Sequence, residues 1–513
     1  LEDRPGDPEG DREGFAGADD VTRSAGLFRK LYKDNDRFVD AEALGKARVF
    51  DMLIGDWGRH EDNWKWAGFD RGDQRIYYPI PRDRDHAFCK WNGLIPYLAN
   101  REWAMPQVES FEADFRGIRS LTWPARHVDR LLLTGLEQED WQGISSHIQE
   151  TMTDEVIDEA VLSLPPEILP VSGFDIGEKL KSRRDQLPEA VDVYYSLLAK
   201  QVDVVGSNKH EFFEVRRLPD GKVWVRMYKK NKEGRIYAEN PLFDRVFERE
   251  ETKEICLYGL DGADVFQVSG SSSKSILVRI IGGPGPDEVV DSSDIRGGAK
   301  ATYIYDTNGT SMLLGPASRD LTSDDPGINL YDRKAFKYNT YFPLPLIYYS
   351  SDDGFVGSFG LNWTRHGFRK QDFKSKHNFN VKAGTVGNVQ VGVHNQWRAL
   401  FGNWDGGLNV DYGHYYPYYN YFGLGNSSVK DPDLFDADYY KVYVKGFISS
   451  LYAENEIFKQ GVFRVGLLFE NLDSRSLTDS IFYVDDKSIP GEDRVTMGGL
   501  NARFTLDFRD RQT

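Results

Sequence analysis

The spacing of hydrophobic and polar residues changes three times along the chain. Between about residues 21 and 204 apolar positions recur with helical spacing. In AEALGKARVFDMLIG one helical face would carry Ala43, Leu44, Ala47, Phe50 and Ile54. Further helices are predicted in ARHVDRLLLTGL, EDWQGISSHIQETM, TDEVIDEAVLSL and LPEAVDVYYSLLAKQV. A β-hairpin interrupts this helical region, because WKWAGFD and RIYYPIP flank the turn residues RGDQ.

A β-rich domain is predicted for residues 205–325. FFEVRRL and KVWVRMYK flank a Pro-Asp-Gly turn, which predicts a hairpin. KEICLYGLDGADVFQVSG and SILVRIIGGPGPDEVVDSS each indicate a strand, a Gly-Asp turn and a short strand. The two turns end at Asp264 and Asp287, 23 residues apart. This repeat predicts stacked coils of a small β-solenoid.

From residue 336 onward the hydrophobic period becomes two, which is typical of strands with one apolar face. About seven long strands are predicted, with aromatic clusters at their ends. Their apolar positions include Phe355, Phe359, Leu361, Trp363, Phe379, Val381, Ala383, Val389, Val391, Val393 and Trp397. Short turns alternate with long polar loops, which favours a transmembrane β-barrel over a soluble sandwich. Because single-chain barrels have an even number of at least eight strands, we expect further strands beyond Thr513.

The composition limits the classes of partner and site that the chain can have. The chain of 513 residues has a net charge of −17, which argues against a nucleic-acid partner. Its two cysteines, Cys89 and Cys256, predict neither a disulfide framework nor a metal cluster. The sequence contains no run of 18 apolar residues, so no transmembrane helix is predicted. Residues 1–20 are interpreted as an acidic, glycine-rich loop, and the absence of a signal peptide suggests a longer precursor.

The stretch DMLIGDWGRHEDNWKW has the residue types of a phosphotransferase loop. Phosphoryl transfer needs a base that orients a hydroxyl and ligands for the metal. Asp56, Arg59 and His60 are the candidate catalytic residues. Asn63 is the candidate ligand for magnesium, together with an acid from PRDRDHAF after the hairpin, Asp83 or Asp85.

This loop resembles that of atypical kinases of the HipA and secretory-pathway kinds, N-x-D-R-H-x-x-N. Gly58 stands where those kinases carry the base, which predicts an inactive loop. Only 55 residues precede Asp56, too few for a complete nucleotide-binding lobe, so a nucleotide is not favoured. Three interpretations stay open: catalysis, binding without turnover, and a buried ion-pair network that pins the hairpin to the helices. The residues of that network would be Arg59, Asp62, Asp83, Arg84 and Asp85.

The Gly-Asp turns allow a calcium hypothesis. GGPGPDEVV matches the repeat of calcium-binding β-rolls, and GLDGADVFQ matches it with one change. Asp264 and Asp287 are the candidate ligands. Calcium requires six to eight oxygens, however, and two repeats supply one site at best. The alternative is that glycine and aspartate simply form tight turns.

The C-terminal part resembles the BamA/TamA-type outer-membrane barrels, also called bacterial surface antigens. The matching stretches are PLPLIYYSSDDGFVGSFGLNWTRHGFR, YYNYFGLGNSS and TLDFRDRQT. The resemblance implies a sixteen-stranded barrel, incomplete in this chain, in the outer membrane of a Gram-negative bacterium, with the preceding soluble part in the periplasm. The combination with GDWGRHEDNW and PIPRDRDHAF is similar to outer-membrane proteins of the Bacteroidetes. Those often carry an upstream metallophosphoesterase domain, of which this chain shows no trace.

The sequence thus predicts a multidomain outer-membrane protein. Its parts are the acidic loop, a mostly helical kinase-like region over 21–204, the solenoid-like domain over 205–325, and the first part of a barrel over 336–513. The BamA/TamA resemblance implies a role in outer-membrane protein assembly, transport or partner docking, with the lipid bilayer and other envelope proteins as partners. The usual βααββ repeats of that family are not found in residues 1–335. The alternative is an envelope phosphotransferase or phosphatase acting on a lipid, sugar or protein.

Overall fold

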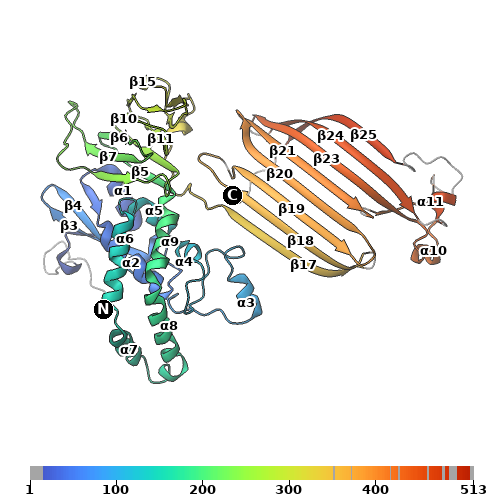
Figure 1. Ribbon diagram of the computed structural model, residues 1–513, viewed down its shortest axis with the longest axis horizontal. Helices are drawn as coiled ribbons and strands as arrows, with labels where there is room; N and C mark the ends of the chain where they lie inside the picture. Colours follow the sequence, from blue (N-terminus) through green and yellow to red (C-terminus); the bar gives the residue numbers. More distant parts are fainter. Residues whose placement is uncertain are drawn as a thin grey trace. The chain divides into compact units, whose positions relative to one another are not determined.

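The structure is a computed structural model with two compact units, Leu1–Lys334 and Ala335–Thr513, shown in Figure 1. It describes residues 15–350, 353–370, 372–415, 418–423, 425, 428–458, 461–476, 480–484 and 494–508. Most of the predicted acidic loop, several residues of YYNYFGLGNSS and the end of TLDFRDRQT therefore lie outside the described residues. The loop's last residue, Asp20, already belongs to a strand.

The first unit begins with a four-stranded sheet of order β1-β3-β4-β2. Its strands are β1 (Asp20–Arg23), β2 (Arg37–Val39), β3 (Trp64–Arg71) and β4 (Gln74–Pro81). The β3–β4 hairpin confirms the sequence prediction. Strands β1 and β2 were not predicted, because three or four residues are too few to show a periodic pattern.

Helices surround this sheet and share one apolar core with it. They are α1 (Ser24–Lys33), α2 (Ala41–Ile54), α3 (Leu94–Ala99), α4 (Ile118–Thr122), α5 (Arg126–Leu132), α6 (Gln138–Thr151), α7 (Asp154–Leu162), α8 (Phe174–Asp185) and α9 (Leu187–Ala199). Two features at the ends of helices agree with the sequence. Thr153 caps α7, and Gly55, at φ 71°, ends α2 in the left-handed conformation that favours glycine.

The predicted apolar face of α2 is confirmed for most of its residues. Leu44 and Ile54 are buried, and Ala47 and Phe50 are partly buried against the same core, whereas Ala43 keeps some exposure. In addition, α2 buries Arg48 and Asp51 along with its aliphatic residues. Arg48 and Asp51 can be buried in this core because each has a partner of opposite charge there.

The predicted helix LPEAVDVYYSLLAKQV also ends early. Helix α9 stops at Ala199, and β5 (Gln201–Val205) begins two residues later. Strand β5 pairs in parallel with β9 (Glu254–Tyr258), so sheet pairing determines the conformation of the predicted helix end.

The β-rich part of the first unit contains two sheets that share one core. One has the order β15-β12-β10-β6-β7-β8, with β13 beside β10, and the other has the order β16-β14-β11-β9-β5. The remaining bounds are β6 (Glu211–Arg217), β7 (Val223–Lys229), β8 (Phe243–Phe247), β10 (Val265–Ser272), β11 (Leu277–Ile281), β12 (Glu288–Asp291), β13 (Asp294–Ile295), β14 (Thr302–Tyr305), β15 (Ser311–Leu314) and β16 (Ser318–Asp320).

The registers confirm two sequence predictions in this part. Strands β6 and β7 form the predicted antiparallel hairpin. Strands β10 and β12 pair in parallel with Val265 opposite Glu288, which is the predicted 23-residue offset between stacked turns. Strands β9 and β11 repeat this offset, with Glu254 opposite Leu277. Successive coils therefore lie on top of one another.

Among its described residues, the second unit contains one antiparallel sheet of nine strands. The order is β17-β18-β19-β20-β21-β23-β24-β25, with β22 beside β23. The bounds are β17 (Thr340–Ser350), β18 (Gly354–Arg365), β19 (Ser375–Gly384), β20 (Val389–Phe401), β21 (Trp404–His414), β22 (Tyr418–Asn420), β23 (Lys441–Phe458), β24 (Gly461–Ser476) and β25 (Val495–Leu506). No helix within the described ranges has the length and apolarity needed to cross a membrane.

Strand β17 was missing from the predicted series. Its two prolines, Pro343 and Pro345, argue against a strand when only the sequence is read. In the structure β17 pairs with β18 and lies at one edge of the described sheet. An edge tolerates proline, because a strand there has one side without ladder hydrogen bonds.

Register divides the second unit's sheet into an apolar and a polar face. Directly opposed residues in an antiparallel pair point to the same side. Phe359 is opposite Val381, Val381 is opposite Val391, and Val391 is opposite Tyr412. These four side chains therefore point to the same side of the sheet. We call this side the apolar face. Its further members, across β17 to β25, include Ile347, Phe355, Leu361, Trp363, Phe379, Val393, Leu408, Val410, Leu451, Val465, Leu467, Phe469, Leu500 and Phe504.

The opposite side, the polar face, carries mainly amides, charges and glycines, except on the edge strand β17, where Phe342, Leu344 and Leu346 point to this side. Its members include Asn362, Asn378, Asn380, Lys382, Gln390, His394, Gln396, Asn409, Asp411, Glu454, Arg464, Asn501 and Arg503. Several of these pair with each other, as His394 does with Asp411 at 2.9 Å. The apolar face is nevertheless open: Ile347 and Leu500 each retain 85% of their accessible surface.

Candidate functional site

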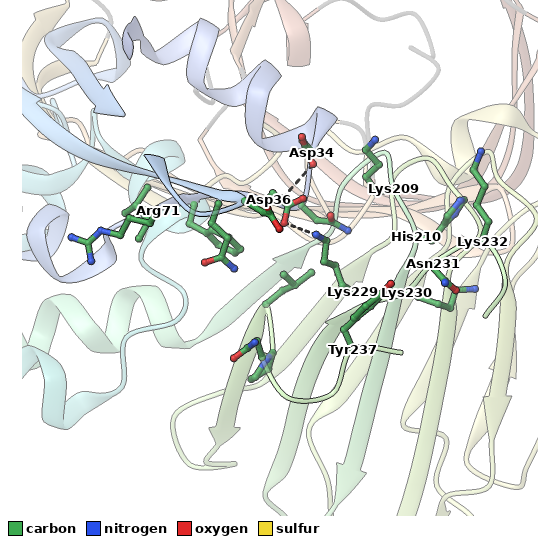
Figure 2. A pocket seen from close by; sticks show the side chains of 18 of the residues that line it. Asp34, Asp36, Arg71, Lys209, His210, Lys229, Lys230, Asn231, Lys232 and Tyr237 are labelled. Atoms are coloured by element: carbon green, nitrogen blue, oxygen red, sulfur yellow. Dashed lines mark hydrogen bonds and ion pairs between the residues drawn. The ribbon is translucent and has the colours of Figure 1, made fainter. Parts of the chain in front are cut away.

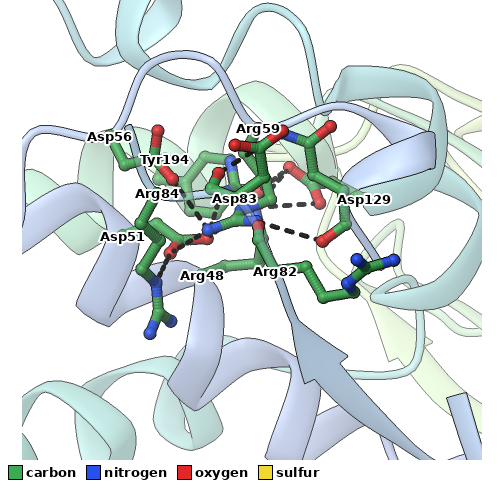
Figure 3. A network of polar contacts seen from close by, with 10 residues as sticks. Arg48, Asp51, Asp56, Arg59, Arg82, Asp83, Arg84, Asp129 and Tyr194 are labelled. Atoms are coloured by element: carbon green, nitrogen blue, oxygen red, sulfur yellow. Dashed lines mark hydrogen bonds and ion pairs between the residues drawn. The ribbon is translucent and has the colours of Figure 1, made fainter. Parts of the chain in front are cut away.

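The kinase-like loop connects α2 to β3 and is held by a buried polar network (Figure 3). Arg59 at its centre is fully buried. Its Nε donates to Asp51 Oδ2 at 2.9 Å, and its Nη2 donates to Asp51 Oδ1 at 3.1 Å and Asp56 Oδ2 at 2.7 Å. Nη1 donates to the backbone oxygens of Asn63 and Arg82. This side chain therefore ties the helix, the loop and the end of the hairpin together.

Asp51 is the anion that the arginines share. Fully buried, it accepts from Arg48 Nη1 at 3.0 Å, Arg59 Nε at 2.9 Å and Arg84 Nε at 3.0 Å. Sequence reasoning missed Asp51 as a site residue, although it lies within the quoted motif. Its signal was a charged residue in the middle of an apolar helix, which requires a partner when buried.

The network continues away from the loop. Arg48 Nε contacts both carboxylate oxygens of Asp129 at 3.1 Å, and Tyr194 donates to Asp129. Burial raises the pKa of Asp129, while Arg48 and Tyr194 oppose this shift. Since Asp129 lies on α5 and Tyr194 on α9, three helices are connected through buried charges. This arrangement agrees with the predicted ion-pair network for Arg59 and Arg84. The predicted acids Asp62, Asp83 and Asp85 are exposed, and Asp51 takes their place.

Asp56, the candidate base, is 1% exposed. One oxygen binds Arg59, and the other, Oδ1, has no hydrogen-bond partner among the described residues. Burial raises the pKa of Asp56, although the Arg59 guanidinium acts against the shift. The carboxylate is enclosed beside Arg59 instead of facing a substrate-sized opening.

The space beside Gly58 is filled by another side chain. A Cβ added to Gly58 would lie 2.3 Å from His86 Nδ1. The His86 ring packs on Trp57, with 4.3 Å between the ring centroids. An aspartate at this position has no room unless His86 moves.

The other candidate residues are dispersed. His60 is exposed, and its Nδ1 accepts the backbone N–H of Asp62 at 3.2 Å, which caps a short 3₁₀ turn. Asn63 is buried, and its amide donates at 3.4 Å to the backbone oxygen of Asp83. The Asp83 and Asp85 side chains are exposed, and Asp85 lies 2.8 Å from His86 Nδ1.

These positions do not fit a magnesium centre. In the described part of the chain, no three His, Cys, Asp or Glu side chains are grouped in a way that could hold a metal ion. Asn63 contacts Asp83 through its backbone, and no contact joins the carboxylates of Asp83 and Asp85 to Asp56.

Glu61 gives the loop a connection that the sequence did not indicate. Its carboxylate binds Arg333 Nη2, and Lys334 Nζ at 2.8 Å. Burial raises the pKa of Glu61, but the hydrogen bonds from Lys334 and Arg333 outweigh it and lower the pKa overall. The loop is thus attached to the last residues of the first unit, which lead into the sheet of the second.

The Gly-Asp turns form a second buried site in the β-rich part. Asp264, Asp287 and Asp306 are at most 3% exposed. Asp264 Oδ1 accepts the N–H of Glu211 at 2.7 Å, and Asp287 Oδ1 accepts the N–H of Asp264 at 2.8 Å. We call these three residues the aspartate ladder. Among the described residues, each has an Oδ2 atom with no hydrogen-bond partner.

The ladder does not supply a calcium shell. Calcium needs six to eight oxygens, whereas one oxygen each of Asp264 and Asp287 is occupied by a backbone N–H. Burial is the first cause that raises the pKa of Asp264 to about 10 and that of Asp287 to about 7. Asp264 is therefore held in its neutral form at neutral pH, whereas Asp287 changes charge in that range. The backbone N–H groups that both accept agree with the alternative of tight structural turns.

A scan against protein-family models and searches of curated proteins and of solved structures returned no match.

Introducing the missing acid is expected to destabilise the first unit. Gly58→Asp forces the new side chain against His86, and overpacking of this kind costs about 1–3 kcal/mol. The double variant Gly58→Asp/His86→Ala should recover part of this loss, because the imidazole that blocks the position is removed. Thermal unfolding followed by tryptophan fluorescence compares the variants. A Gly58→Asp single variant as stable as the parent would contradict the steric interpretation.

Proposed function

We propose that this chain is an outer-membrane protein of the BamA/TamA type. In this proposal its antiparallel sheet is part of a transmembrane barrel, and its soluble unit is a kinase-derived scaffold without catalysis in the periplasm. Its role is to present that scaffold to a partner during outer-membrane assembly or transport. One observation carries the proposal: a sheet of long strands with one exposed apolar face and one polar face.

A two-faced sheet of this kind suits a lipid boundary. In water, an open face with residues such as Leu500 and Ile347 would cost free energy in proportion to its apolar area. In a membrane the same residues face hydrocarbon, and the polar residues face an aqueous lumen. Most of the strands have 10 to 18 residues, and about 9–11 tilted residues are enough to cross a bilayer.

The aromatic residues support the same orientation. On β17 and β18 the apolar face ends in Tyr341 and Trp363 on one side and in Tyr349 and Phe355 on the other. Between these ends lie residues such as Ile347 and Leu361. Aromatic girdles that flank an aliphatic band are typical of membrane interfaces.

The scaffold role of the first unit rests on how the loop's polar atoms are used. The Arg59 guanidinium donates hydrogen bonds to Asp51, Asp56 and backbone oxygens. Gly58 has no space for a base. Glu61 binds the segment that leads into the sheet. These contacts favour a rigid support over the alternative phosphotransferase.

A charge placed on the apolar face should have a much larger effect than one on the polar face. Leu500 and Asn501 are adjacent, exposed residues on opposite faces of β25. Leu500→Arg is expected to cost about 2–4 kcal/mol of stability in a bilayer, while Asn501→Arg costs less than about 1 kcal/mol. Urea-induced unfolding of the chain folded into vesicles measures both. Equal losses for the two variants would contradict the proposed orientation.

The assembly role has a separate test. Vesicles that contain the chain should accelerate the folding of a reporter barrel relative to empty vesicles. A variant that lacks residues 21–204 should fold its sheet normally but lose this acceleration if the scaffold recruits the client. No acceleration by the intact chain would reject the assembly role while leaving the membrane orientation in place.

A further inference from the structure

The first unit contains a large open cavity that the proposed function does not use. Its volume is about 1270 Å³. It lies between the loop after α1, the turn of the β3–β4 hairpin, and the loops at one end of β6 and β7 (Figure 2). The cavity is lined by charged and amide side chains, with few apolar ones. Its chemistry therefore suits a polar ligand.

One end of the cavity is cationic although the chain as a whole is acidic. Lys209, His210, Lys230 and Lys232 come from the loop before β6 and the loop after β7, and Glu233 from the second loop is an acidic residue of the lining beside them. Figure 2 shows Lys209, His210 and Lys232 gathered at this end, away from Arg71. Within the described ranges, no carboxylate lies at ion-pair distance from the ammonium groups of Lys209, Lys230 or Lys232. Lys229, by contrast, is neutralised by Asp36.

The surroundings of His210 and Lys230 at this end are defined by a hydrogen bond and by burial. His210 Nδ1 accepts the backbone N–H of Ala263 at 2.9 Å, so a neutral His210 carries its proton on Nε2, as a donor. Lys230 is half-buried, and its charge acts to lower the pKa values of Asp264 and Asp287. Three ammonium groups and one imidazole N–H thus offer donors for a compact oxyanion.

The rest of the cavity offers acceptors and a flat surface. Asp34 and Asp73 supply carboxylate oxygens, and Gln74 supplies an amide. Tyr237 also lines the cavity and is 44% exposed, with the Arg235 guanidinium 5.4 Å from the centroid of its ring. Carboxylates and amides accept hydrogen bonds from hydroxyl groups. Together with a neighbouring aromatic ring, they suit a ligand that carries several hydroxyl groups. Free inorganic phosphate would use only the cationic end.

We propose that this cavity binds a phosphate monoester carried on a sugar or polyol. The phosphate lies among Lys209, His210, Lys230 and Lys232, and the hydroxylated ring lies toward Asp34 and Tyr237. The group can belong to a free metabolite or to a lipid headgroup, since the chemistry is the same. This binding is independent of the proposed membrane role.

Calorimetric titration of the full chain in detergent tests the proposal with four probes. These are inorganic phosphate, myo-inositol 1-phosphate, unphosphorylated myo-inositol, and phosphatidylinositol 4-phosphate mixed into the micelles. The soluble inositol phosphate is expected to bind at least tenfold more tightly than inorganic phosphate, and unphosphorylated inositol should not bind. Tighter binding of the lipid than of the soluble probe would assign the natural ligand to a headgroup; equal binding would assign it to the free metabolite.

A charge-matched pair of double variants supplies the control. Lys209→Gln/Lys230→Gln removes two ammonium groups from the cationic end, and affinity should fall by about tenfold for each charge-assisted hydrogen bond lost. Lys200→Gln/Lys274→Gln changes the net charge equally outside the cavity lining and should leave affinity unchanged. The proposal is overturned if neither phosphorylated probe binds saturably, or if both double variants lose affinity equally.

Discussion

Asp51→Asn is expected to destabilise the first unit by about 3–5 kcal/mol, because it removes the shared anion of a buried charge network. Three guanidinium groups contact this carboxylate. The amide has the same shape but leaves Arg48 and Arg59 buried without full compensation. Thermal and denaturant unfolding followed by tryptophan fluorescence report this loss, since most tryptophans lie in the first unit.

Asp56→Asn is the matched control for this substitution. Asp56 is equally buried, but it contacts only Arg59 in the network. Burial already raises its pKa, so losing the charge should change stability by less than about 1 kcal/mol. If the two asparagine variants lost the same stability, Asp51 would not be the centre of the network.

After Asp51→Asn, the second large effect is expected for Asp264→Asn, which should stabilise the first unit at alkaline pH. In the folded chain Asp264 is nearly fully enclosed and its Oδ2 has no partner among the described residues. Asparagine keeps the oxygen that accepts the N–H of Glu211 and removes a carboxyl that costs free energy when ionised. At pH 8 the Tm should rise by about 2–6 °C, and at pH 4 it should change little.

The sign of this pH dependence follows from the raised pKa values. Asp264 titrates at about 10 and Asp287 at about 7 when folded, against an ordinary value of 3.8. The folded chain therefore holds protons that the unfolded chain releases above pH 4. Stability is fully present below pH 4 and falls as pH rises toward 7 and then toward 10. Thermal unfolding from pH 4 to pH 9 should show this decline, and Asp264→Asn should flatten it.

The same measurement decides between a neutral ladder and the calcium hypothesis. If calcium occupied the ladder, millimolar calcium would raise the Tm at pH 8, and Asp264→Asn would lose that increase. A neutral ladder predicts no calcium effect in the parent and a higher Tm in the variant. The two hypotheses therefore predict opposite signs for one substitution.

Much of the fold follows from periodicity in the sequence. The alternation at Phe355, Phe359 and Trp363 predicted one face of the sheet, and the observed register puts them together. The 23-residue repeat predicted the stacking of β10 and β12. Both succeed because side-chain direction in a strand has a fixed period of two. The short strands β1 and β2 carry too few residues for such a pattern.

The candidate site was harder to predict. The motif predicted Arg59 and Asp56 as candidate catalytic residues, but spacing alone cannot distinguish a catalytic carboxylate from one that is paired with a buried arginine. The decisive partners, Arg48 and Asp129, lie 81 residues apart and meet only in the folded chain. The role of His86 was likewise hidden, because its contact with the position of Gly58 depends on how the hairpin returns to the loop.

The central claim is that the apolar face of the second unit contacts lipid. Ser450 and Leu451 are neighbours on opposite faces of β23, and cysteine at each position, in a Cys89→Ala background, can carry a bimane label. In vesicles, brominated lipid should quench the label at position 451 strongly, while aqueous iodide should quench the label at position 450. If lipid and iodide quenched both labels equally, or in the reverse order, the claim would be contradicted.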